Sequence, residues 1–268
     1  MSRKVLMAIG AHSDDIEFNA GGTLFKYLEK GYEVVYILAT NNMSGSWGSL
    51  DEKGKRVYKT VPWHEIMPQR KIEAAAGAAA FGTTAIHLDH PQRHYINDDL
   101  ERIDLAYGVP RPECVPENTP TILMAHEKPA ARKQLAELIV QYEPEAILTH
   151  DLFQNDMEHI GTSLLVAKTV RECKFPGMLL LWPCADETPY GNICTVGRQT
   201  YIDISDFYSK KMEAMKLHKC QLPSIDHIRF RPWEEGLDCE HVEAFAVCCE
   251  GEGGGEFSQE IREHWQRS

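Results

Sequence analysis

The feature that most constrains this chain is a polar stretch, residues 11–17, that directly follows an apolar run, residues 5–9. The stretch is Ala11-His12-Ser13-Asp14-Asp15-Ile16-Glu17, and it is followed closely by Gly21-Gly22-Thr23. The apolar run predicts a buried strand, and residues 24–30 predict an amphipathic helix that ends at Gly31. A histidine and two aspartates therefore follow the carboxyl end of a strand, where open α/β sheets bind ligands.

This combination of residue types predicts a divalent-metal site. Neutral imidazole and carboxylate oxygen are both good zinc ligands, so His12 and one of the adjacent carboxylates, Asp14 or Asp15, can bind a metal. The other carboxylate is then free to handle protons. The alternative interpretation is an ordinary polar connection in which an aspartate caps the helix, and a short motif alone does not separate the two.

A second polar cluster follows another predicted strand, residues 146–148, and precedes a helix predicted over residues 160–173. The cluster contains His150, Asp156 and His159. Because parallel strands end at the same edge of a sheet, this cluster can supply a third ligand to a metal held by His12 and Asp15. His159, at the head of the helix, is the first choice for this ligand, and His150 is the competitor.

Short apolar runs alternate with longer helical patterns along the chain. This alternation predicts an α/β fold with a Rossmann-like, mostly parallel sheet flanked by helices. Further strands are expected at residues 33–39, 85–89, 178–182, 199–204 and 243–247, and further helices at 68–81, 130–142 and 205–218. No repeat or domain boundary is evident in the sequence. We therefore predict a single domain over residues 1–268, with an insertion or long loop over 90–128 and a tail over 251–268.

The sequence also supports predictions about individual loops and side chains. The loop at residues 40–48 is rich in Gly, Ser and Asn and is either a wall of the site or a mobile surface loop. His94 and His126, in the 90–128 segment, are expected to be exposed to solvent rather than to touch a substrate. Lys211 is expected to face solvent, and the adjacent Cys248 and Cys249 are expected to pack within a strand.

Composition narrows the classes of partner. The formal net charge of −12 argues against a nucleic-acid or anionic-membrane partner, because either would need a basic face. No apolar run approaches the roughly 20 residues of a membrane span, and the N-terminus shows no signal-peptide pattern. We therefore expect a cytoplasmic protein with a small-molecule substrate. The eight cysteines include no Cys-x-x-Cys pair, which argues against a zinc ribbon or a thioredoxin-type site.

Taken together, the motifs resemble those of the PIG-L (LmbE-like) family. Its members are zinc-dependent deacetylases that remove acetyl groups from N-acetylglucosamine in larger conjugates. The resemblance rests on residues 11–17 with Gly21-Gly22-Thr23, on Arg70-Lys71-Ile72-Glu73, on His159, on the 203–221 segment and on Glu243-Ala244-Phe245. It covers most of the chain, although the opening motif is its most specific part.

The resemblance implies a role for each matching residue. His12, Asp15 and His159 are implied as ligands of one zinc per chain, although such a set also accepts other divalent metals. Asp14 is implied as the general base. Arg70 is implied to bind substrate, with an ion pair to Glu73 on the same helix as the alternative. The family also implies a homo-oligomer, a trimer or hexamer.

Two residues depart from the family pattern. Ser13 replaces the usual proline, and Asp156 replaces a histidine that stabilises the oxyanion and protonates the leaving group in several members. Asp156, or His150 in its place, is therefore the candidate for that role. The function expected is hydrolytic removal of acetyl from an N-acetylglucosamine-type or related amino-sugar conjugate. The alternatives are a metal-dependent amidase acting on a non-sugar N-acyl compound and a catalytically impaired family member that binds a metal or ligand.

Overall fold

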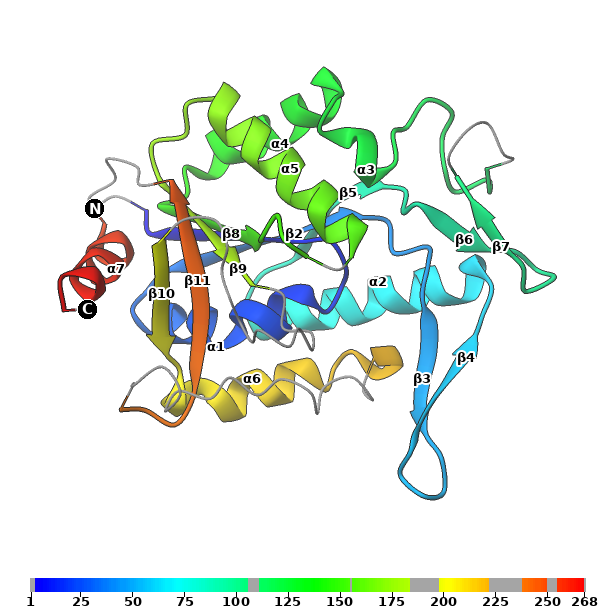
Figure 1. Ribbon diagram of the computed structural model, residues 1–268, viewed down its shortest axis with the longest axis horizontal. Coiled ribbons are helices and arrows are strands. Elements are labelled where there is room, and N and C mark those ends of the chain that lie inside the picture. The colour runs from blue at the N-terminus through cyan, green and yellow to red at the C-terminus, as the bar shows by residue number, and fades with distance from the viewer. Residues whose placement is uncertain are drawn as a thin grey trace.

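Strands from both ends of the chain share one sheet. The computed structural model describes residues 3–105, 111–154, 156–183, 198–221, 238–249 and 255–267. Within these ranges, seven strands form the main sheet (Figure 1): β1 (Val5–Gly10), β2 (Glu33–Thr40), β5 (Ala85–His90), β8 (Ala146–His150), β9 (Met178–Trp182), β10 (Arg198–Asp203) and β11 (Val242–Cys249). Their spatial order is β10-β11-β9-β8-β1-β2-β5.

The central strands run parallel, so their carboxyl ends meet at one edge. β1 pairs in parallel with β2 on one side and with β8 on the other, and the β2–β5 and β8–β9 pairs are also parallel. β11 is antiparallel to both β9 and β10. The predicted mostly parallel sheet is confirmed. Because the chain leaves β1 toward β2 on one side and later returns at β8 on the other, the switch point of the sheet lies between β1 and β8.

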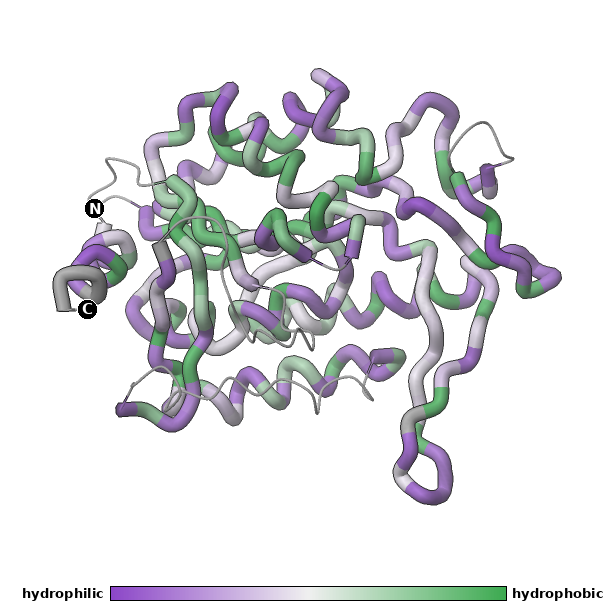
Figure 2. Tube along the Cα trace, viewed as in Figure 1, coloured by the Kyte–Doolittle hydropathy of each residue, from purple (hydrophilic) through white to green (hydrophobic). Residues whose placement is uncertain are grey.

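Helices cover both faces of this sheet (Figure 1). One face carries α1 (Asp15–Glu29), α2 (Trp63–Ala80) and α6 (Tyr208–Met215), and the other carries α3 (Ile122–Ala125), α4 (Pro129–Tyr142) and α5 (Met157–Glu172). Side chains of β1 alternate between the two apolar clusters, with Leu6 on the α1 face and Met7 on the face of α4 and α5. The central strands are accordingly the most hydrophobic part of the chain (Figure 2). Among the described helices, none is long and apolar enough to cross a membrane.

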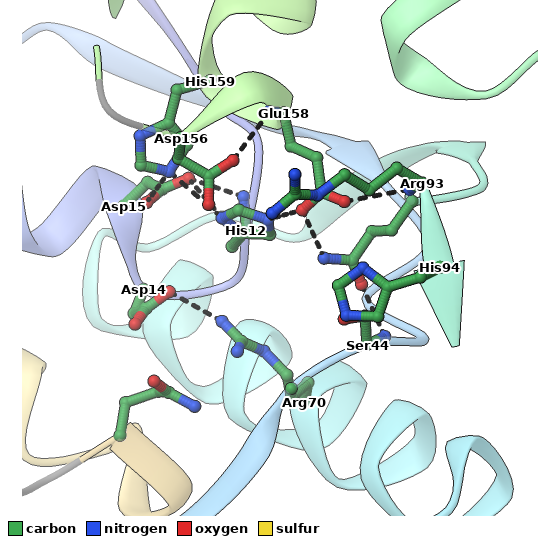
Figure 3. Close-up of a pocket in the computed structure, with 13 residues that line it drawn as sticks. His12, Asp14, Asp15, Ser44, Arg70, Arg93, His94, Asp156, Glu158 and His159 are labelled. Atoms are coloured by element: carbon green, nitrogen blue, oxygen red, sulfur yellow. Dashed lines mark hydrogen bonds and ion pairs between the residues drawn. The ribbon is translucent and has the colours of Figure 1, made fainter. Parts of the chain in front are cut away.

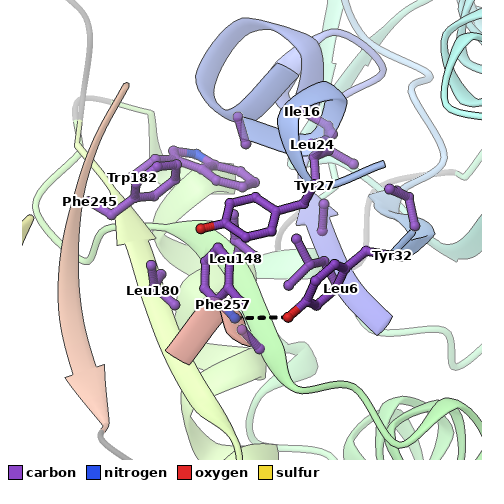
Figure 4. Close-up of a cluster of buried hydrophobic side chains, with 14 of the residues drawn as sticks. Leu6, Ile16, Leu24, Tyr27, Tyr32, Leu148, Leu180, Trp182, Phe245 and Phe257 are labelled. Atoms are coloured by element: carbon purple, nitrogen blue, oxygen red, sulfur yellow. Dashed lines mark hydrogen bonds between the residues drawn. The ribbon is translucent and has the colours of Figure 1, made fainter. Parts of the chain in front are cut away.

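The last helix, α7 (Glu256–Arg267), is anchored by apolar contacts. Phe257 and Ile261 are fully buried, and the ring of Phe257 meets the ring of Tyr27 edge to face at 4.6 Å (Figure 4). The backbone N–H of Phe257 also donates to the Tyr32 hydroxyl at 2.8 Å. The C-terminal part of the predicted tail is therefore packed onto the sheet, whereas residues 251–254 lie outside the described residues.

Two hairpins in the described part of the chain lie outside the main sheet. β3 (Ser46–Leu50) pairs with β4 (Arg56–Thr60), and β6 (His94–Ile96) pairs with β7 (Arg102–Asp104). The β6–β7 hairpin and α3 both fall within the 90–128 segment predicted as an insertion or long loop. The β3–β4 hairpin projects beyond the body of the protein (Figure 1).

Two helices begin earlier than the sequence pattern predicts. α2 begins at Trp63 rather than at Pro68, and this proline lies inside the helix. α5 begins at Met157 rather than at residue 160, because the Asp156 carboxylate caps it by accepting the N–H of Glu158 at 2.7 Å. The early start places His159 in the first turn of α5, directly at the edge of the sheet.

A buried ion pair joins α6 to the sheet and to α1. The late helical segment divides into a 3₁₀ turn, η1 (Ser205–Phe207), and α6. Lys211 of α6, expected to face solvent, is instead buried and donates to Glu243 of β11 at 2.6 Å. Glu243 also accepts the backbone N–H of Gly22 at 2.9 Å and that of the next residue at 2.7 Å. The expectation for Lys211 was wrong because its partner lies on a distant strand.

The adjacent Cys248 and Cys249 lie at the end of β11, as expected, but their side chains are exposed. The register between β11 and β9 shifts between Val247 and Cys249. The expectation that these cysteines are packed was therefore wrong: the irregular register falls at Cys248, and both side chains stay exposed although Cys249 pairs with Leu179 of β9.

Gly22 of α1 packs closely against Ile204, the residue that follows β10, and this contact leads to a prediction on stability. A Cβ at Gly22 would lie 2.6 to 2.9 Å from three side-chain atoms of Ile204. We expect Gly22→Ala to lower the free energy of unfolding by about 1–3 kcal/mol, because the core has no room for the methyl group. Denaturant unfolding measures this change.

Gly21→Ala is the matched control on the same helix. Its Cβ would meet Lys211 at 3.4 Å, which is ordinary contact, so the higher helix propensity of alanine should leave stability equal or raised. Equal unfolding free energies for Gly21→Ala and Gly22→Ala would contradict the close approach at Gly22.

Candidate active site

Three segments bring the predicted site residues together at the carboxyl edge of the sheet (Figure 3). His12 lies on the turn after β1, Asp15 opens α1, and His159 lies in the first turn of α5 after β8. β1 and β8 are neighbours in the sheet, so the two polar clusters meet although they are well over a hundred residues apart in the chain. The structure therefore places His12, Asp15 and His159 in one cluster.

The spacing within this cluster suits a metal. His12 Nδ1 lies 3.2 Å from His159 Nε2 and 3.6 Å from Asp15 Oδ2, and His159 Nε2 lies 3.3 Å from Asp15 Oδ1. Two ligands of one tetrahedral zinc, each about 2.0–2.2 Å from the ion, lie roughly 3.3 Å apart. The three side chains can therefore hold a divalent metal with little rearrangement.

The outer nitrogen of each histidine has a partner that turns the inner nitrogen toward the cluster. His12 Nε2 lies 2.8 Å from the Glu158 carboxylate, and His159 Nδ1 lies 3.2 Å from the Gln154 side-chain oxygen. Each acceptor favours a proton on the outer nitrogen and a free lone pair on the inner one. This arrangement is typical of metal-binding histidines.

Glu158 is a site residue that our sequence analysis did not assign. Its buried carboxylate lies 2.8 Å from His12 Nε2, accepts the side-chain N–H of Gln92 at 2.8 Å and accepts the backbone N–H of Arg93 at 2.9 Å. Although burial opposes ionisation, the hydrogen bond from His12 lowers the pKa of Glu158 to about 2. The sequence did offer an indication of this role. Glu158 directly precedes His159, a predicted ligand, and metal-binding histidines usually form a hydrogen bond with a carboxylate.

The electrostatics of the cluster favour a cation. Burial alone would lower the pKa of His12, but the Asp15 charge and the Glu158 hydrogen bond outweigh it and raise that pKa to about 9. Burial would likewise raise the pKa of Asp15, yet the charge of His159 above all holds it well below its usual range. The carboxylates thus draw positive charge to the position that a metal would occupy.

His150, the competing ligand, lies against Asp15 and His159, and ligand atoms of these three side chains are also close enough to one another to hold a metal ion. It is fully buried and is not among the residues that line the cavity. Trp182 Nε1 donates to His150 Nδ1 at 3.0 Å, while His150 Nε2 lies 3.0 Å from the backbone N of Ala11 and 3.1 Å from Asp15 Oδ2. Burial and the charge of His159 lower its pKa to about 4, so the ring is neutral near pH 7. These contacts place His150 against Asp15, where it supports the carboxylate from behind.

Asp14 and Arg70 form an ion pair at the cavity wall. Arg70 Nη2 donates to Asp14 Oδ1 at 2.7 Å, and Arg70 Nε donates to the Ser13 hydroxyl at 3.0 Å. Glu73, the alternative partner of Arg70, instead accepts hydrogen bonds from Gln69 and from Cys220. The hypothesis of an Arg70–Glu73 ion pair was therefore wrong, and Arg70 is tied to the predicted base.

Asp156 is on the cavity wall beside the histidines. One of its carboxylate oxygens caps α5 at the N–H of Glu158. A carboxylate oxygen of Asp156 and ring nitrogens of His12 and His159 lie within 4.8 Å of one another. Asp156 therefore lies close to both histidines, and it lines the cavity.

These residues border a cavity of about 300 Å³, near the lower end of the size of ligand sites. Ser44 and Gly45, from the loop predicted either as a wall or as a mobile segment, form part of its lining. Our sequence analysis did not place Gln92, Arg93 or Gln221 in the site, and it favoured exposure for His94. All four line the cavity, because the loop between β5 and β6, the start of β6 and the segment after α6 border it.

The fold and the site together define an α/β protein whose switch point carries a cavity that can hold a divalent metal. Residues 7–170 match the family model PIG-L, described as GlcNAc-PI de-N-acetylase. The match spans more than half of the chain, so the chain belongs to the PIG-L family. The resemblance drawn from the motif residues is thus confirmed.

Individual relatives are more distant. The uncharacterized deacetylase YaiS of Escherichia coli is 35% identical over 67 residues, which cover 24% of this chain and 36% of that protein. The diacetylchitobiose deacetylase of Thermococcus kodakarensis is 24% identical over 228 residues, covering 82% of this chain and 71% of that protein. The structure of the N,N'-diacetylchitobiose deacetylase from Pyrococcus horikoshii matches with a TM-score of 0.61 at 18% sequence identity. The match covers 92% of this chain and 84% of that one. This last likeness extends the shared fold over nearly the whole chain.

The contacts of Glu158 lead to a prediction on metal affinity. We expect Glu158→Gln to weaken Zn²⁺ binding roughly 10- to 100-fold, because the partner that orients His12 loses its charge. Competition titration against a chromophoric chelator measures the dissociation constant. Glu172→Gln, at the exposed end of the same helix, is the control and should leave the constant unchanged. Equal affinity in wild type and Glu158→Gln would show that Glu158 does not orient a metal ligand.

Proposed function

We propose that this protein is a zinc-dependent N-deacetylase that releases acetate from an N-acetylglucosamine-type or related amino-sugar conjugate. The observation that carries the proposal is the close set of His12, Asp15 and His159 beside Asp14, within the cavity that this PIG-L family chain forms. The named relatives described as diacetylchitobiose deacetylases support an acetylated amino sugar as the substrate class.

In this proposal His12 Nδ1, the Asp15 carboxylate and His159 Nε2 would hold the zinc. Three protein ligands leave a position open for water or substrate. When bound, zinc lowers the pKa of its water toward ~7 and polarises an amide carbonyl. Glu158 and Gln154 orient the two histidines, and His150 holds the Asp15 carboxylate from behind.

Asp14 is the proposed general base. Arg70 binds one of its oxygens and fixes the carboxylate at the cavity wall, which leaves the other oxygen to accept a proton from the attacking water. Arg70 therefore acts in this scheme by positioning Asp14. The substrate-binding role expected for Arg70 is limited by these contacts, since two of its nitrogens already have partners.

The leaving amine needs a proton, because an amide nitrogen is a poor leaving group. Of the two candidates, His150 and Asp156, we assign this role to Asp156, because it lines the cavity and His150 does not. In its carboxylic acid form Asp156 donates the proton to the amine nitrogen as the C–N bond breaks.

The first test combines metal content with acetate release. Zinc-loaded wild type is expected to release acetate from at least one compound in a panel of N-acetylglucosamine, its disaccharides and its conjugates. Asp14→Asn should lower kcat roughly 10²- to 10⁴-fold while one zinc per chain stays bound, because it removes the base but keeps an oxygen for Arg70. A protein that binds zinc but releases no acetate from any member of the panel would contradict the proposed function, and absence of bound metal would contradict the whole site.

The assignment of Asp156 has a separate test. Asparagine retains the oxygen that caps α5 but carries no acidic proton, so Asp156→Asn should lower kcat roughly 10²- to 10⁴-fold without changing unfolding free energy. Asp156→Ser, which also caps the helix, should show the same loss. If Asp156→Asn retained the kcat of wild type, Asp14 would have to serve both proton transfers.

A further inference from the structure

The cavity is lined by two arginines among the described residues, and their surroundings differ. Arg70 is bonded to Asp14 and Ser13, as described above. Arg93 donates its backbone N–H to Glu158, but no carboxylate of the described residues lies within ion-pair distance of its guanidinium. Its Nε atom is buried and has no hydrogen-bond partner. A partly buried guanidinium without an acceptor is costly, so this group is suited to a ligand that supplies one.

The neighbouring residue shows the same pattern. His94 also lines the cavity; its Nε2 lies 2.8 Å from the Ser44 hydroxyl, and its Nδ1 is buried without a partner. Burial and the charge of Arg102 lower the pKa of His94, so its ring is neutral and can exchange a hydrogen bond with a ligand. Figure 3 shows Arg93 and His94 on one side of the site, with Asp15 and His159 on the other.

The remaining charges of the cavity explain why an arginine is needed here. Four carboxylates line it, those of Asp14, Asp15, Asp156 and Glu158. Asp14 is neutralised by Arg70, and Glu158 is paired with His12. The wall would therefore repel a negatively charged ligand unless a positive group were free to meet it. Arg93 is that group, and a planar guanidinium matches a carboxylate or phosphate in a two-point geometry.

We infer that Arg93, assisted by His94, forms a subsite for an oxyanion group, a carboxylate or a phosphate, on the amino-sugar conjugate. This inference rests on the proposed deacetylase function and narrows its substrate class to anionic conjugates. The acetamido group faces the metal ligands, and the anionic substituent lies toward the β6–β7 hairpin. The backbone of Arg93 is held by the same Glu158 that orients His12, so the subsite and the metal ligands share one support.

The experiment compares neutral and anionic forms of the same sugar. The probes are N-acetylglucosamine, N-acetylmuramic acid for the carboxylate, and the 1- and 6-phosphates of N-acetylglucosamine. Dissociation constants are measured by calorimetry on zinc-loaded protein in an Asp14→Asn background, with and without Arg93→Gln, and kcat and KM are measured without the Asp14 change. At least one anionic probe should bind tenfold or more tightly than the neutral sugar.

In Arg93→Gln this preference should fall roughly ten- to hundredfold, while affinity for the neutral sugar stays within twofold. Arg93→Lys should retain part of the preference, because it keeps the charge but not the two-point geometry. Arg70→Lys gives the contrast, with a loss of kcat on neutral and anionic substrates alike. Preference for muramic acid alone assigns a carboxylate, and preference for a phosphorylated sugar alone assigns a phosphate.

Two outcomes would overturn the inference: wild type without any anionic preference, or an Arg93→Gln variant that weakens neutral and anionic probes equally. Failure of the proposed function looks different. If no probe releases acetate but the anionic preference and its loss in Arg93→Gln are seen, the subsite stands and the deacetylase proposal falls. If neutral sugars are hydrolysed and Arg93→Gln shows no charge selectivity, the deacetylase proposal stands and the subsite falls.

Discussion

The hydrogen bond between Glu158 and His12 is the contact on which the rest of the site depends. Glu158 lies in the first turn of α5, and its carboxylate also accepts hydrogen bonds from Gln92 and from the backbone of Arg93. One buried group thus joins the loop after β1, the head of α5 and the start of the β6–β7 hairpin. Because it engages the outer nitrogen of His12, the inner nitrogen turns toward Asp15 and His159.

The charged side chains that line the cavity differ in the groups that they contact. The carboxylates gathered around the two histidines favour a cation at the sheet edge, as the raised pKa of His12 shows. Arg70 forms an ion pair with Asp14 at the cavity wall. Arg93 also lines the cavity, but its Nε atom has no hydrogen-bond partner among the described residues, and on this difference we propose that Arg70 positions Asp14 whereas Arg93 binds the ligand.

Part of the site could be predicted because its residues directly follow strands. His12, Asp15 and His159 come after apolar runs predicted as parallel strands, so all three were expected at one edge of the sheet, and the structure shows that the two strands are neighbours. Arg70, Glu158 and Arg93 were harder to assign, because their roles depend on which partner each side chain reaches across the fold. A local ion pair between Arg70 and Glu73 was equally consistent with helix spacing, and packing of α2 against the first loop decided otherwise.

The sequence by itself determined the α/β class, the mostly parallel sheet and the edge at which the polar loops meet. These follow from the period of hydrophobic residues and from the fixed direction of parallel strands, which are local properties. Only the tertiary structure decided that Lys211 is buried against Glu243, that His150 stands behind Asp15, and that the β6–β7 hairpin contributes to the cavity. Each of these depends on contacts between segments distant in the chain, where charge pairing and burial, rather than local pattern, select the partner.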